Sequence, residues 1–182
     1  MTATLALPFF TSLGALLFEF ALSHFLSISL GDSSFGFDFV IGVFLFFMGL
    51  GAFASEQSPR LRAQPAPALV AVEAALALLC LLALPALSWT SGALHAWELT
   101  AESCRSLLCT RAGLGLIFEA GAWLALTGVL VGMEIPLFLR LFQTAAGRVL
   151  AADYFGAFVA GLAFPLWLLP RLGSLGTLVL AG

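Results

Sequence analysis

The sequence contains no lysine and little charge of either sign. Seven arginines stand against ten acidic residues among 182, so 9% of the chain is charged, whereas soluble domains carry about 25%. Because basic side chains are so few, no basic stripe exists that would neutralise phosphates, and nucleic acid is excluded as a partner. In contrast, 62% of the residues are hydrophobic and the mean hydropathy is +1.10, which excludes a water-soluble globule.

The motifs of most enzyme classes are also missing. The chain has no glycine-rich dinucleotide or phosphate loop, no His-Glu-x-x-His zinc motif and no serine nucleophile elbow. Its two histidines, His24 and His95, fall on different predicted elements, which disfavours a haem held between them. The residues themselves therefore predict no cofactor, no metal and no catalytic group.

Cysteine is scarce, and its three positions differ in character. Cys80 lies in an apolar run, which is typical of a buried small side chain. Cys104 and Cys109 lie in a polar stretch and would form a short disulfide if that stretch faced an oxidising compartment. Free thiols and a metal site that also uses His95 are the alternatives, the latter short of ligands.

Five apolar segments are long enough to cross a bilayer as helices, which needs about 20 residues each. They are followed or separated by short turns, except for one longer polar loop at 90–111. The segments are 5–30, 35–54, 67–89, 112–138 and 154–169. An apolar tail at 172–182 is only half as long, and is either part of a sixth helix or a re-entrant or interfacial segment. The predicted fold is all-α, a single polytopic transmembrane bundle over residues 1–182 with five full spans and a partial sixth.

The arginines predict an orientation, since short basic loops stay in the cytoplasm. If the spans alternate, the arginines divide four against three between the two sides: Arg60, Arg62, Arg140 and Arg148 on one, and Arg105, Arg111 and Arg171 on the other. The loops of the first side are short, whereas Arg105 shares its loop with two glutamates. We therefore expect a cytoplasmic N-terminus, with the Cys104/Cys109 loop outside.

Ionisable side chains within the spans are costly and are the candidates for a site. They are Glu19, His24, Glu73, Glu119, Glu134 and Asp153. Counting 1.5 Å per residue sorts them into an outer layer, Glu19, His24 and Glu119, and an inner layer, Glu73, Glu134 and Asp153 near Arg148. Acids without matching bases would bind a cation or relay protons. Alternatively each acid is protonated or hydrogen-bonded and only fixes packing, as glycines such as Gly49 and Gly51 do.

Several stretches resemble the membrane-embedded polyamine aminopropyltransferases, spermidine-synthase-like proteins with an N-terminal transmembrane domain. These stretches are LFEF at 17–20, LGDSSFGFDFVIGVFLFFMGLGAF at 30–53, GMEIPL at 132–137 and ADYFGAFVAGLAFPLWLLPRLG at 152–173. The resemblance implies a helical membrane domain in the bacterial inner membrane. In that family a soluble domain binds decarboxylated S-adenosylmethionine and the amine. The sequence given stops before any such domain, so no catalytic residue can be assigned.

Two functions follow as expectations from the resemblance. The first is a non-catalytic membrane subunit or scaffold that packs against other subunits of a larger membrane complex. The second is the membrane half of a polyamine aminopropyltransferase or of a polyamine- or cation-handling protein, in which the unpaired carboxyls attract an amine. In both, the lipid bilayer is the surrounding medium.

Overall fold

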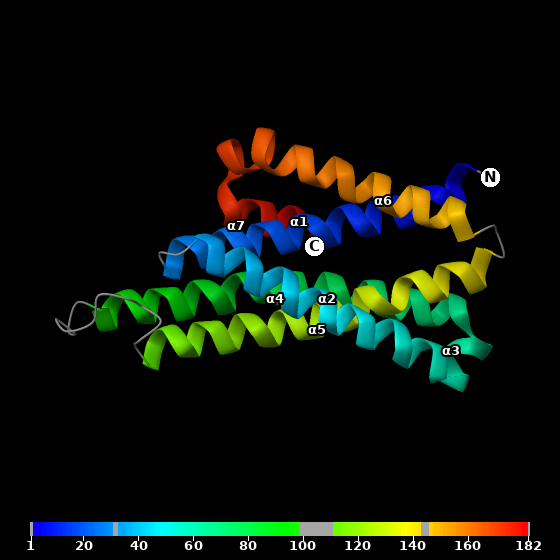
Figure 1. The fold of residues 1–182 in the computed structure, drawn as a ribbon, viewed down its shortest axis with the longest axis horizontal. Helices are drawn as coiled ribbons and strands as arrows, with labels where there is room; N and C mark the ends of the chain where they lie inside the picture. The colour runs from blue at the N-terminus through cyan, green and yellow to red at the C-terminus, as the bar shows by residue number, and fades with distance from the viewer. Residues whose placement is uncertain (1, 31–32, 99–110, 143–145, 182) are drawn as a thin grey trace.

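The computed structural model describes residues 2–30, 33–98, 111–142 and 146–181, and within these ranges the chain is helical with no strand. The all-α prediction is therefore confirmed. The helices are α1 Thr2–Leu30, α2 Ser33–Gln57, α3 Pro59–Ala63, α4 Pro65–Glu98, α5 Arg111–Phe142, α6 Ala146–Ala163, the π-helical segment η2 Phe164–Leu168, and α7 Leu169–Ala181. The long ones run back and forth along one axis (Figure 1).

Five stretches are long and apolar enough to cross a membrane, the number that the sequence predicts. They are Leu5–Leu30, Ser34–Gln57, Pro65–Thr90, Leu114–Phe142 and Ala146–Ser174. Within each stretch the backbone hydrogen bonds are made inside the helix, so the apolar side chains can point outward without stranding polar groups. Many of the largest do so, including Phe46, Phe118 and Phe158.

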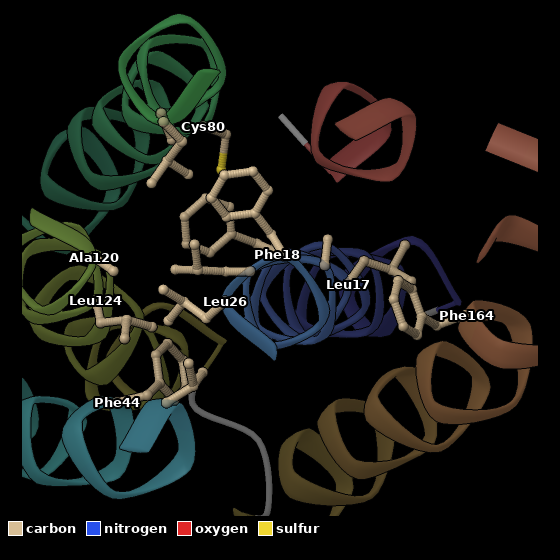
Figure 2. Close-up of a cluster of buried hydrophobic side chains, with 14 of the residues drawn as sticks. Leu17, Phe18, Leu26, Phe44, Cys80, Ala120, Leu124 and Phe164 are labelled. Atoms are coloured by element: carbon tan, nitrogen blue, oxygen red, sulfur yellow. The ribbon is translucent and has the colours of Figure 1, made fainter. Parts of the chain in front are cut away.

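Helix α1 occupies the centre of the bundle and packs against α2, α4, α5, α6 and α7. Figure 2 looks along it and shows α4, α5 and α2 on one side and α6 and α7 on the other. Phe18 and Leu26 of α1 point toward the first group, where they meet Phe44, Cys80 and Leu124. This main core fixes where each polar side chain of α1 can lie.

The tightest helix contact joins α2 and α5 and depends on glycine. A methyl group at Gly132 would collide with the backbone of Met48, and one at Gly51 with the backbone of Val129. Gly128, four residues before Gly132, lies against the backbone and side chain of Phe44 and Phe47 in the same way. The small-x-x-x-small spacing of Gly128 and Gly132 thus lets two apolar helices approach closely.

The chain reverses direction after α6. Pro165 lies inside η2, and the Leu169 N–H bonds to the Phe164 carbonyl across one extra residue, which widens the helix locally. At Gly173 the backbone has φ 69° and ψ 179°, a conformation open almost only to glycine. Beyond it α7 runs back along α1, so the apolar tail turns inward (Figure 1).

Two stretches differ from the expected loops. Helix α4 continues past Trp89 to Glu98, within the predicted 90–111 loop, because no proline interrupts this stretch. The short helix α3 forms in the polar connection between the second and third segments. Cys104 and Cys109 lie outside the described residues.

Candidate functional site

A cavity of about 250 Å³ lies between α1, α2, α4 and α5, in the half of the bundle that contains the start of α1. Its wall is mostly apolar, with two glutamates and two threonines as its hydrogen-bonding side chains apart from the Cys80 thiol. The lining residues are Leu7, Phe10, Thr11, Gly14, Ala15, Phe18, Phe44, Glu73, Leu76, Ala77, Cys80, Thr127, Val131 and Glu134.

Helical periodicity brings these residues onto the cavity wall. On α4, Glu73, Leu76, Ala77 and Cys80 recur at intervals of three and four residues, so they share one face. Thr127, Val131 and Glu134 do the same on α5, as do the lining residues of α1. The two glutamates therefore face the same space from neighbouring helices. This shared face is the signal that identifies Thr11 and Thr127 as site residues, which the sequence analysis missed.

Glu134 is the most enclosed acid of the cavity, with 3% of its surface exposed. Its Oε1 atom, like Oε1 of the half-buried Glu73, is buried without a hydrogen-bond partner. The two carboxyl groups lie within electrostatic range of each other, and Asp153 of α6 lies within range of Glu134. Close to these carboxyls lie the hydroxyls of Thr11 for Glu134 and Ser12 for Asp153.

The three helices α4, α5 and α6 hold these carboxyl groups at one depth. Along its candidate span, Glu134 precedes Phe142 by eight residues and Glu73 follows Pro65 by eight, which is about 12 Å in each case. Asp153 follows Ala146 by seven residues, about 10 Å. The three acids of the expected inner layer are thus brought together in the structure, in the third of the bundle nearest the start of α1.

The residues of the expected outer layer are not part of the cavity. Glu19 is buried, 6% exposed, on α1, and His24 packs edge-on to Phe164 with ring centroids 6.4 Å apart. Glu119 is half-buried on α5. Among the described residues no hydrogen bond or ion pair links these three side chains. The expected meeting of Glu19, His24 and Glu119 therefore stays a prediction.

No described arginine forms an ion pair with the acids of the cavity. Arg60, Arg62, Arg140 and Arg148 lie beyond it, at the end of the bundle where α3 and the start of α6 are found (Figure 1). Arg140 donates a hydrogen bond of 3.1 Å to the Ser55 carbonyl, and Arg62 donates one to the Glu56 carbonyl. Arg62 and Arg140 thus bond to carbonyl groups near the end of α2. The carboxyls of the cavity have no described arginine as a counter-charge.

The oxygen atoms of the cavity wall suit a cation that needs few oxygen ligands. Within the described ranges no group of three or more His, Cys, Asp or Glu side chains could hold a metal ion. The Thr127 hydroxyl donates to the Trp123 carbonyl at 2.8 Å and that of Thr11 to the Pro8 carbonyl at 3.3 Å, so both retain oxygen lone pairs for a donor. An organic ammonium, or a proton on each carboxyl, suits this arrangement.

Known relatives match nearly the whole chain. The chain is 37% identical over 179 residues to polyamine aminopropyltransferase 2 of Streptomyces coelicolor, covering 92% of this chain and 29% of that protein. It is 35% identical over 174 residues to polyamine aminopropyltransferase 2 of Ralstonia nicotianae, and 30% identical over 181 residues to polyamine aminopropyltransferase 2 of Aquifex aeolicus, which cover 92% and 96% of it. The chain is homologous to a segment of the polyamine aminopropyltransferases.

The resemblance stated from the sequence is thereby confirmed for the aminopropyltransferase family. The chain spans less than a third of the length of these polyamine aminopropyltransferases, 30% of the protein of Ralstonia nicotianae and 32% of that of Aquifex aeolicus. No protein-family model and no solved structure matches the chain.

Proposed function

We propose that this chain is a membrane-embedded, non-catalytic helical module of a polyamine aminopropyltransferase-like protein or complex. In this proposal the five candidate spans cross the bacterial inner membrane, the N-terminus is cytoplasmic, and α7 is a re-entrant segment that enters the bilayer without crossing it. The module acts as a scaffold that holds partner subunits or a soluble enzyme domain at the membrane.

The observation that carries this proposal is the combination of apolar helices with homology limited to part of the relatives. Five helices have the length and hydropathy of spans, and large side chains such as Phe46, Phe53 and Phe155 point outward, as expected where acyl chains surround a protein. The match covers 92% of the chain but 29% of the Streptomyces coelicolor protein. Four arginines at the end of the bundle that contains the start of α1 support the proposed orientation.

Membrane fractionation and topology mapping test the proposal. We expect the chain to sediment with membranes, to resist extraction by alkaline carbonate and to dissolve in mild detergent. A reporter that is active only in the cytoplasm should be active when fused after Gln64 and inactive when fused after Gly92. Recovery of the chain in the soluble fraction, or the opposite reporter pattern, would contradict the spans or the orientation.

Association with other subunits needs its own measurement. Affinity purification in mild detergent at native expression should recover a stoichiometric partner protein, and cross-linking should join it to the Phe-rich outer faces of α2 or α6. A lone monomer under these conditions would contradict the scaffold role.

A second function is favoured by the cavity. Glu73 and Glu134 both line the cavity, each has a buried carboxyl oxygen without a hydrogen-bond partner, and no described arginine pairs with either. Because the relatives are named for polyamines, we propose as the alternative that the module handles a polyamine or another cation at these carboxyls. Binding of spermidine that is lost in Glu134→Gln and retained in Glu119→Gln would support it; equal binding in both variants would exclude it.

A further inference from the structure

We infer that the cavity between α1, α2, α4 and α5 binds a small linear aliphatic amine, with its ammonium group between Glu73 and Glu134 and its methylene chain against the aromatic wall. The inference rests on the second function proposed above and specifies the ligand class and the groups that recognise it.

Two carboxyl groups of the cavity are buried and incompletely hydrogen-bonded. Glu134 lines the cavity, is 3% exposed, and has a buried Oε1 atom without a hydrogen-bond partner. Oε1 of Glu73 is also buried and unpartnered on the facing helix. A buried polar atom without a partner is destabilising, so a ligand that donates to both carboxyl groups recovers free energy that the protein alone has lost.

An ammonium group suits these oxygen atoms as the donor. A primary ammonium group has three N–H donors, which matches two carboxylate oxygens and one hydroxyl oxygen such as that of Thr11, beside Glu134. A hard metal ion is usually held by several carboxylates together with other oxygen ligands, and within the described ranges no group of three or more His, Cys, Asp or Glu side chains could hold one. Phe10 and Phe18 add ring faces, which attract a desolvated cation.

The cavity is large enough for a small ligand and is connected to the surface of the bundle. The cavity volume of about 250 Å³ is many times the ~10–15 Å³ that one water molecule needs. It lies just below the volume of about 300–1,000 Å³ that pockets for drug-sized ligands have. The lining side chains range from the enclosed Phe18 to Phe10, which is 64% exposed, so the cavity reaches the surface of the bundle. Leu7, at the same outer end, lies two residues inside the candidate span, about 3 Å from its start. An amine can therefore enter from the membrane interface.

The experiment measures binding to the full chain purified in mild detergent, by calorimetry and by thermal stability. The probes are n-butylamine and its uncharged analogue 1-butanol, with NaCl at equal concentration as the control for ionic strength. We expect saturable binding of n-butylamine, with none for 1-butanol and no competition from sodium beyond screening. Glu134→Gln and Glu73→Gln should each weaken the affinity for n-butylamine roughly ten- to hundredfold.

Matched variants separate the site from general effects. Glu119→Gln changes an acid of the same helix outside the cavity and should bind n-butylamine like the parent chain. Ala77→Leu adds volume to the cavity wall without changing charge and should weaken binding, which keeps the inference testable if a Gln variant does not fold. Equal binding of n-butylamine and 1-butanol, unchanged affinity in Glu134→Gln and Glu73→Gln, or no saturable binding overturns the inference. The membrane role proposed above fails separately, by the fractionation result.

Discussion

Adding one methyl group at Gly51 should destabilise the bundle, whereas adding it at Gly49 should not. Both glycines lie on α2, two residues apart, yet a Cβ at Gly49 would meet nothing within 4 Å, and one at Gly51 would lie 2.9 Å from Val129 Cα and closer still to its carbonyl group. Since ordinary contacts begin at 3.4 Å, α2 and α5 must separate by at least 0.5 Å at this point. The obstacle is backbone, so no side-chain rotation relieves it.

The expected cost follows from overpacking, which is about 1–3 kcal/mol for added methyl or methylene groups in a close-packed interior. The usual gain in helix propensity from Gly to Ala is about 1 kcal/mol in water. It contributes little if α2 spans the membrane as proposed, because such a helix stays helical when the bundle separates. We therefore expect Gly51→Ala to lower the free energy of unfolding by about 1–3 kcal/mol and Gly49→Ala to change it by less than about 0.5 kcal/mol.

The assay is reversible unfolding of the detergent-solubilised chain, titrated with a denaturing detergent and followed by tryptophan fluorescence and circular dichroism. Gly132→Ala, on the other side of the same helix contact, should behave like Gly51→Ala, because its Cβ would collide with the backbone of Met48. Equal unfolding free energies for Gly49→Ala and Gly51→Ala would refute the close approach of α2 and α5.

Three further changes test other parts of the fold by the same unfolding assay or by cross-linking. Phe18→Ala, at a side chain 2% exposed, should cost about 3–5 kcal/mol, whereas Phe118→Ala, at one 82% exposed, should cost little in a micelle; similar losses for both would contradict the packing of α1. Gly173→Ala should strain the kink inside α7 by about 1–3 kcal/mol and reduce cysteine cross-linking between α7 and α1, and unchanged cross-linking would argue against the kink. Arg140→Ala should cost about 1 kcal/mol by removing the hydrogen bond to the Ser55 carbonyl, and no loss would mean that water replaces it.

The helices and the depth of the acids could be predicted from the sequence because both depend on distance along the chain. Apolar runs of sufficient length predict helices, and counting residues from their ends places Glu73, Glu134 and Asp153 at one level. Rotation about each helix axis is not fixed by such counting. Glu19 and Glu119 illustrate this, since their depths are similar but neither is among the described side chains that line the cavity.

Packing partners were likewise beyond the sequence. Gly49 and Gly51 are alike in composition and neighbourhood, and only the position of α5 decides that Gly51 is at the contact and Gly49 is open. In an all-apolar helix the pattern of hydrophobic residues does not mark a buried face, because lipid and protein interior are similarly apolar. The periodic signal that normally orients a helix is therefore weak here, and small residues and rare polar ones carry the information.

Helix α7 and the cavity lie in different halves of the bundle. Helix α7 contacts both α1 and α4, and it lies beside α1 in the half of the bundle remote from the start of α1 (Figure 1). There it covers the seam between these two helices. The cavity lies between α1, α2, α4 and α5 in the other half, from Leu7 to Phe18 of α1, and none of the described α7 side chains is in its wall. Gly173 lies outside this wall, so we expect a substitution there that loosens α7 to leave the Glu73 and Glu134 wall intact.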